Sequence, residues 1–218
     1  MPNLDYSDLR HEARRLKRSN LLDQLNDIRK AKLPRPDGES SVFVSSMEGE
    51  RALSRGLHQW KQTIIEPVGE VKDGPILDLY IKQGINWGWV EEYKNRKFAW
   101  CGAFAGWCWE ESVKKEIRKK CFPSTYRLKE WAKGSQRIIK KLEDAREGDL
   151  IIVGHKKPWG DHITLFDRMD DQGYWSVEGN AYGETPKGGA RQEGVIRRYR
   201  NVEEIKYIYR PLKVDLNG

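Results

Sequence analysis

Helical spacing of apolar residues runs through the first two thirds of the chain. Apolar positions recur at three- and four-residue steps over residues 5–32, 47–65 and 101–119, which predicts amphipathic helices. A shorter helix is expected from Ile76 to Gln83, and a basic helix over about residues 125–143. The chain up to about residue 143 is therefore predicted to be mainly helical.

Alternation of apolar and polar residues replaces the helical spacing in the last third. Five short runs separated by Gly, Pro and Asp are typical of strands. They cover residues 149–154, 162–168, 174–180, 195–200 and 206–210. Helices followed by strands predict an α+β fold, in which the N-terminal helices pack on one face of a C-terminal antiparallel sheet.

The stretch PRPDGESSVFVSS, residues 34–46, has the composition of a linker. We therefore expect residues 1–46 to form a helical appendage, either a docking or oligomerising hairpin or a partly disordered arm. Residues 47–218 are expected to form the main domain. The N-terminus has no apolar core of a secretory signal, and no run reaches the roughly 20 apolar residues of a transmembrane helix.

Positive charge is concentrated in one window. The chain carries 40 Lys and Arg against 33 Asp and Glu, a net charge of +7. Residues 114–141 alone hold eleven basic residues against two glutamates, a local balance of +9. Such a window favours an anionic partner, such as nucleic acid, anionic lipid or cell-wall polymer, or else it is a solvated helix face.

Three cysteines and four scattered histidines, with no CxxC pair, argue against a disulfide scaffold and against a zinc site. Cys101 begins a predicted helix, where unpaired N–H groups and the helix dipole lower a thiol pKa from about 8.5 into the range of about 3.5–7.5. Cys108 is interpreted as a core residue and Cys121 as a surface thiol. The small residues Gly102 and Gly106 predict close packing of another backbone on this helix.

A cysteine nucleophile needs a base and a group that orients the base. The candidate bases are His155, in a polar loop, and His162, which opens a predicted strand and is therefore held more rigidly. Glu178 and Asn180 alternate along one strand, so their side chains share a face.

The turn DDQG decides whether these groups meet. A three-residue loop, Asp170–Gln172, places His162 opposite Asn180 and diagonal to Glu178, with all three side chains on one face. A loop with an even number of residues turns Glu178 and Asn180 to the other face. An odd loop is therefore the expectation.

Four short motifs appear in a fixed order. They are Trp100-Cys101-Gly102-Ala103-Phe104, Gly148-Asp149, Gly160-Asp161-His162-Ile163 and Glu178-Gly179-Asn180. In order and approximate separation they resemble the CHAP domains, the cysteine, histidine-dependent amidohydrolases/peptidases of the NlpC/P60 and papain-like group. The similarity covers about residues 55–210.

The resemblance implies a papain-like, NlpC/P60-like fold and an enzyme that hydrolyses amide bonds in bacterial peptidoglycan. The enzyme would be an N-acetylmuramoyl-L-alanine amidase or a peptide endopeptidase. Matched by motif, Cys101 is the nucleophile, His162 the general base and acid, and Glu178 and Asn180 the orienting partners. The Cys101 backbone N–H would meet the oxyanion.

Tryptophans close to these motifs are expected to line a substrate groove, because aromatic faces suit sugar rings and peptide stems. They are Trp87, Trp89, Trp100 and Trp159. Some family members bind calcium through an acidic cluster before the cysteine. Here Asp73 and Asp78 are too sparse to predict that site, so no cofactor is expected.

A catalytic domain with a helical appendage suits a phage lysin, a virion-associated lysin or an injected antibacterial effector. Such a protein would reside in the host cytoplasm before its release to the wall, or in the virion. Residues 1–46 would mediate virion contact or self-association, and nucleic acid is not the expected partner. The alternative is a non-catalytic basic structural or adaptor protein of a virion, or a cell-wall-binding module.

Overall fold

The computed structural model describes residues 46–65, 76–85, 99–154, 161–186 and 191–217. The chain divides into two units, Met1–Ser40 and Ser41–Gly218, and every described residue belongs to the second unit. The helix predicted over residues 5–32 and most of the predicted linker lie outside the described residues.

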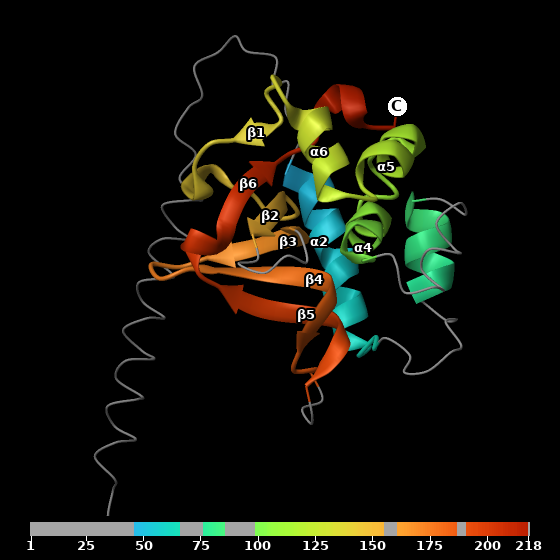
Figure 1. Ribbon diagram of the computed structural model, residues 1–218, viewed down its shortest axis with the longest axis vertical. Coiled ribbons are helices and arrows are strands. Elements are labelled where there is room, and N and C mark those ends of the chain that lie inside the picture. Colours follow the sequence, from blue (N-terminus) through green and yellow to red (C-terminus); the bar gives the residue numbers. More distant parts are fainter. Residues whose placement is uncertain (1–45, 66–75, 86–98, 155–160, 187–190, 218) are drawn as a thin grey trace, which may run out of the picture. The chain divides into compact units, whose positions relative to one another are not determined.

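Short helices make up the first part of the described chain (Figure 1). They are α2 (Ser46–Lys61), the π-helix η1 (Ile76–Ile85), α4 (Cys101–Cys108), α5 (Lys115–Cys121) and α6 (Thr125–Ala132). Single 3-10 turns follow later, at η3 (Leu142–Asp144), η4 (Val202–Glu204) and η5 (Lys213–Asp215). Within the described ranges, none of these helices is long and apolar enough to cross a lipid bilayer.

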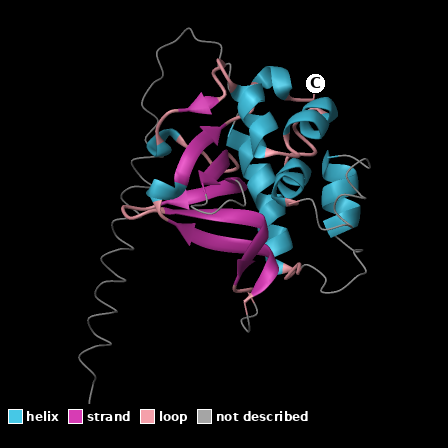
Figure 2. Cartoon of the chain, in the orientation of Figure 1, coloured by secondary structure: helices cyan, strands magenta, loops and turns pink. Residues whose placement is uncertain are grey.

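Six strands form one antiparallel sheet. They are β1 (Ile138–Ile139), β2 (Leu150–Gly154), β3 (Asp161–Met169), β4 (Tyr174–Gly183), β5 (Gln192–Arg200) and β6 (Ile205–Tyr209). Their order across the sheet is β1-β6-β2-β3-β4-β5. All five predicted strands are confirmed, and the two-residue β1 was not predicted. The predicted α+β class, with helices beside an antiparallel sheet, is confirmed (Figure 2).

Both faces of the sheet are covered. Alternate residues of the central strands, such as Ile152, Ile163 and Val177, join the main core with the helices. Their neighbours, such as Ile151 and Phe166, form a second, smaller core on the opposite face. The rigid centre of the sheet is therefore the part that carries β3 and β4.

The helix predicted over residues 101–119 is two helices. The α4 helix ends at Cys108, and Val113 instead forms a β-bridge with Leu216. The Lys114 N–H donates to Asp215 O at 2.9 Å, and Lys114 is extended, with ψ 135°. A contact with the C-terminal segment therefore ends the helix, although the local apolar spacing continues.

Two other predicted helices are shorter than their patterns. The α2 helix ends at Lys61, and Thr63 follows in the left-handed region with φ 61°. The α6 helix ends at Ala132, whose carbonyl accepts from the Ser135 hydroxyl at 2.6 Å. Gly134 then reverses the chain with φ 66°.

Glycines set the close crossing of η1 and α4. A Cβ on Gly84 would lie 2.6 Å from Ala103 O, and a Cβ on Gly106 would lie 3.0 Å from Gly84 O. A Cβ on Gly102 would lie only 1.9 Å from Phe122 O. The predicted close packing against the small residues of this helix is confirmed, and η1 extends to Ile85, two residues beyond its predicted end at Gln83.

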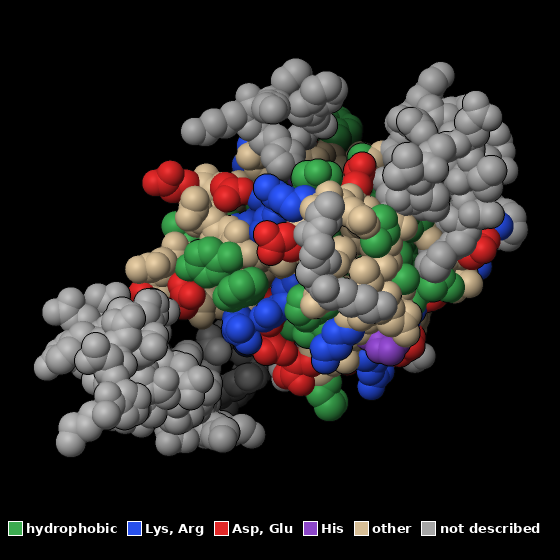
Figure 3. Space-filling view, turned by 90° about the horizontal axis from the view of Figure 1, so that it is seen from below, with side chains coloured by type: hydrophobic (Ala, Val, Ile, Leu, Met, Phe, Trp, Pro, Cys, Tyr) green, Lys and Arg blue, Asp and Glu red, His purple; other side chains and the backbone are tan. Residues whose placement is uncertain are grey.

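The basic window contributes both to structure and to surface. Arg118 is buried and donates to the carbonyls of Gln83 and Gly84, while Arg137 forms a two-bond ion pair with Asp215. The other nine basic side chains of residues 114–141 are exposed or half-buried. On the face seen in Figure 3, side chains of both charges are interspersed.

We predict that Gly84→Ala lowers the free energy of unfolding by about 1–3 kcal/mol, because the added methyl group overpacks the crossing with α4. Urea denaturation measures this loss. Gly134→Asn is the control, since nothing lies within 4 Å of a Cβ there and Asn tolerates the left-handed region. Equal stability of both variants would contradict the proposed packing role.

Candidate active site

The candidate nucleophile stands at the first position of α4. Cys101 follows the N-cap residue Trp100, and only 5% of its surface is exposed. The first N–H groups of a helix have no partner within the helix. Those of the first turn of α4 are therefore available to stabilise negative charge near the thiol.

A β-bulge brings the candidate base to the correct face of the sheet. The loop between β3 and β4 has four residues, 170–173, because Met169 pairs with Tyr174. The predicted three-residue loop is therefore wrong. The Asp170 carboxylate accepts the N–H groups of Gln172 and Gly173 and so stabilises the four-residue turn.

The extra residue of the bulge compensates for the even loop. The pairing shifts between Phe166 and Arg168, which leaves Asp167 as an inserted residue, and beyond it Leu165 pairs with Val177. Beyond the bulge, the pairs Phe166–Ser176 and Leu165–Val177 have the register that the sequence predicted. The Asp167 carboxylate accepts from Arg197 Nε at 2.8 Å, an ion pair that holds the bulge.

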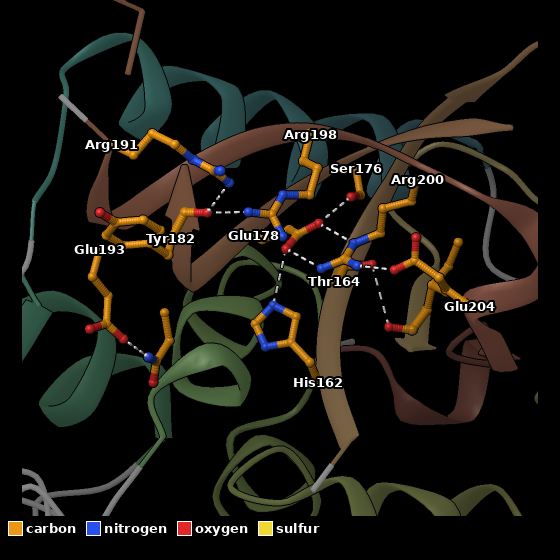
Figure 4. A network of polar contacts seen from close by, with 12 residues as sticks. His162, Thr164, Ser176, Glu178, Tyr182, Arg191, Glu193, Arg198, Arg200 and Glu204 are labelled. Carbon is orange, nitrogen blue, oxygen red and sulfur yellow. Dashed lines mark hydrogen bonds and ion pairs between the residues drawn. The ribbon is translucent and has the colours of Figure 1, made fainter. Parts of the chain in front are cut away.

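Glu178 lies at the centre of a buried polar network (Figure 4). Its Oε1 accepts from the Ser176 hydroxyl at 2.6 Å and from Arg200 Nε at 2.6 Å. Its Oε2 accepts from Arg200 Nη2 at 2.8 Å and lies 3.2 Å from His162 Nε2. None of Glu178 is exposed, whereas 7% of His162 is. The carboxylate is thus enclosed, and the imidazole borders solvent.

The thiol and the imidazole form a charge pair. Burial raises the pKa of Cys101, but the charge and hydrogen bond of His162, with the backbone N–H groups of Ile163 and Gly102, outweigh burial and lower it. Burial lowers the pKa of His162, but Cys101 and then Glu178 raise it to about 9. The surroundings of the two groups therefore favour a thiolate and an imidazolium.

The ring nitrogens have separate tasks. Because Nε2 of His162 is bonded to Glu178, Nδ1 is the nitrogen that can exchange a proton with the thiol. Burial raises the pKa of Glu178, but the hydrogen bonds and charges of His162 and Arg200 hold it well below its usual range. Glu178 is therefore an ionised acceptor that fixes the ring.

Asn180 contacts the start of α4 and a residue of β5, and its expected role as an orienting partner of His162 remains a prediction. Its Oδ1 accepts from the Trp100 N–H at 2.6 Å, and its Nδ2 donates to Glu193 at 2.5 Å. Its backbone is left-handed, with φ 58°, a conformation that Asn tolerates. Asn180 therefore positions the start of the helix that carries Cys101, and the carboxylate of Glu178 orients the imidazole.

Trp100 is a core residue, which corrects its predicted place in a substrate groove. Only 1% of it is exposed, and its ring stacks on Tyr80 with centroids 5.6 Å apart. A Cβ on Gly179 would lie 2.6 Å from the Trp100 ring, so the glycine of the third motif lets β4 approach α4. Trp87, Trp89, Trp159 and His155 lie outside the described residues.

The other two cysteines are buried. Cys108 belongs to the core, as predicted, and burial raises its pKa. The predicted surface position of Cys121 is wrong, since only 5% of it is exposed at the end of α5, and burial raises its pKa too. Cys101 is thus the one thiol of the three whose surroundings favour the thiolate.

Arg200 and Ser176 are site residues that the sequence analysis missed. Glu178 pairs with Ile196 and Tyr174 with Arg200 across β4 and β5, so Arg200 shares the face of Glu178. The alternation of residues along β5 indicates which of its side chains share a face. To use it, one must also know the register between β4 and β5, which a loop separates. The Gly148-Asp149 motif is structural, since Asp149 forms a buried two-bond pair with Arg210.

No group of three or more His, Cys, Asp or Glu side chains in the described ranges is arranged to hold a metal ion. Asp78 forms an ion pair with Lys82 at 2.7 Å, and Asp73 lies outside those ranges. Comparison of the chain with protein-family models, with curated proteins and with solved structures finds no match.

Cys101 should react with iodoacetamide near pH 6 because His162 stabilises its thiolate, whereas Cys108 and Cys121 should react slowly. His162→Ala removes the positive charge, so the rate at Cys101 should fall at least tenfold at pH 6. Mass spectrometry of peptides from protein alkylated between pH 4 and 10 measures each site. A rate at Cys101 that does not respond to the substitution would contradict the charge pair.

Asn180→Asp should lower the free energy of unfolding by about 1 kcal/mol, because a second carboxylate would face Glu193 in place of the amide donor. The double variant Asn180→Asp/Glu193→Gln restores a donor and should recover part of that loss. Urea denaturation of both variants measures the effect. The absence of any recovery would show that the pair with Glu193 is not what supports Asn180.

Proposed function

We propose that the chain is a cysteine-dependent hydrolase of amide bonds in bacterial peptidoglycan, with a papain-like CHAP domain over residues 47–218. The observation that carries the proposal is the convergence of Cys101, His162 and Glu178 from three separate elements. A thiolate at a helix start, an imidazolium and an enclosed carboxylate are, in that order, the nucleophile, the acid–base group and the orienting group that nucleophilic acyl transfer needs.

The proposed reaction has two halves. The Cys101 sulfur attacks the carbonyl carbon, and the Cys101 backbone N–H stabilises the oxyanion. His162 donates its proton to the leaving nitrogen, so the C–N bond breaks, an amine leaves and a thioester remains. His162 then takes a proton from water, whose oxygen attacks the thioester. The C–S bond breaks, the carboxylic acid leaves, and the Cys101 thiolate and the His162 imidazolium are regenerated.

Peptidoglycan as the substrate rests on the four motifs and their order. The geometry supports acyl transfer from an amide, and the motifs point to a wall amide, cut as an N-acetylmuramoyl-L-alanine amidase or as a peptide endopeptidase. Nine surface cations of residues 114–141 would suit a polymer with anionic groups. A phage lysin, a virion-associated lysin and an injected effector all fit this activity.

Clearing of purified peptidoglycan tests the proposal. We expect the wild-type chain to clear walls of at least one bacterial type, and Cys101→Ala to lose at least about 10³-fold of the rate, because no other group replaces the nucleophile. Cys121→Ala, a change at a second buried thiol, is the matched control and should retain activity. Mass spectrometry of the released fragments identifies the amide that is cut.

Failure of the folded wild-type chain to clear several wall types would favour the non-catalytic adaptor. Equal clearing by Cys101→Ala would instead exclude a cysteine mechanism. Circular dichroism of each variant shows that the comparison is between folded proteins.

A further inference from the structure

Arg200 encloses the carboxylate that orients the base. The side chain of Arg200 is 3% exposed and donates from Nε and Nη2 to the two oxygens of Glu178. With Ser176 and His162, these donors occupy about four acceptor sites, the full capacity of a carboxylate. Glu178 therefore has one orientation, in which Oε2 faces His162.

We propose that Arg200 is a positioning residue for the base, which keeps Glu178 ionised and directed at His162 Nε2 and so extends the thiolate–imidazolium pair to acid pH. The proposal rests on the proposed function only in calling His162 the base. The contacts themselves define the chain of dependence: Arg200 holds Glu178, Glu178 holds the ring, and the ring holds the thiolate.

The charge of Arg200 matters because the carboxylate is fully buried. A buried carboxylate without a counter-ion takes up a proton well above its ordinary pKa. A protonated Glu178 would no longer stabilise the imidazolium, so the thiolate would lose its partner as the pH falls. With Arg200 present, the carboxylate stays charged and the acid limit is set by the thiol itself.

Other charged and titratable groups surround the network. Tyr174 on β4 lies near Glu178 and Arg200, and Glu204 in η4 forms an ion pair with Arg200 Nη1. Arg198, which pairs with Ser176 across β4 and β5, lies on the same face and donates to Tyr182 O. Arg200 therefore lies between two carboxylates, those of Glu178 and Glu204.

Lysine would not replace Arg200 fully. A guanidinium presents two parallel N–H groups to two oxygens, whereas an ammonium is a single point charge. Arg200→Lys would keep the carboxylate ionised but would release one oxygen. Its effect should therefore lie between that of the wild type and that of a neutral side chain.

The test measures the pH dependence of Cys101 alkylation by iodoacetamide in the full chain, which needs no wall substrate. In Arg200→Gln, the acid limb should move up by at least one pH unit, which is a tenfold slower rate at a pH on that limb. Arg200→Lys should show a smaller shift. An unchanged acid limb in folded Arg200→Gln would overturn the proposal.

Arg210→Gln is the matched control. Arg210 also forms a buried two-bond pair, with Asp149 at 2.8 and 2.6 Å, where Asp149 directly precedes β2 and Arg210 directly follows β6. This substitution should lower the melting temperature and leave the acid limb of Cys101 unmoved. A shift equal to that of Arg200→Gln would show a general loss of stability and would also overturn the proposal.

A double variant keeps the test decisive where Arg200→Gln fails to fold. Glu178→Gln/Arg200→Gln contains no uncompensated buried charge, and its acid limb should match that of Glu178→Gln alone. A further shift in the double variant would show that Arg200 acts by another route. If alkylation depends on Arg200 but the chain does not clear walls, only the proposed function is wrong. If the chain clears walls but alkylation does not depend on Arg200, only this inference is wrong.

Discussion

A buried carboxylate stays ionised only when hydrogen-bond donors surround it, and the residues of the site supply these donors to Glu178. Glu178 has no exposed surface, so each of its oxygens must be bonded or the group would be neutral. Its own strand supplies Ser176, the strand on one side supplies His162 and the strand on the other supplies Arg200. The order β3-β4-β5 is thus the structural requirement of the site.

One inserted residue reconciles the turn with that requirement. A four-residue turn alone would direct Glu178 to the opposite face from His162, and Asp167 restores the register. The sequence predicted the final register through the wrong loop length. A bulge cannot be predicted from alternation, because it depends on a partner such as Arg197, which lies 30 residues away along the chain.

Local patterns predicted which elements exist better than where they end. The five strands and the start of the helix at Cys101 follow from alternation and from the small residues after the thiol. The end of that helix follows from a bridge between Val113 and Leu216, which no local pattern contains. For the same reason Cys101, His162 and Glu178 were predictable as candidates, while Arg200 needed the pairing of β4 with β5.

The ion pair between Arg200 and Glu178 also affects when the His162 imidazolium releases its proton in the proposed reaction. With the carboxylate already paired, the thiolate is the leading positive influence on the pKa of His162, ahead of Glu178. Attack on a carbonyl turns that thiolate into a neutral sulfur, so the largest influence that raises the pKa of the ring is lost, while burial still lowers it. The imidazolium becomes a stronger acid at the moment when the leaving nitrogen needs a proton.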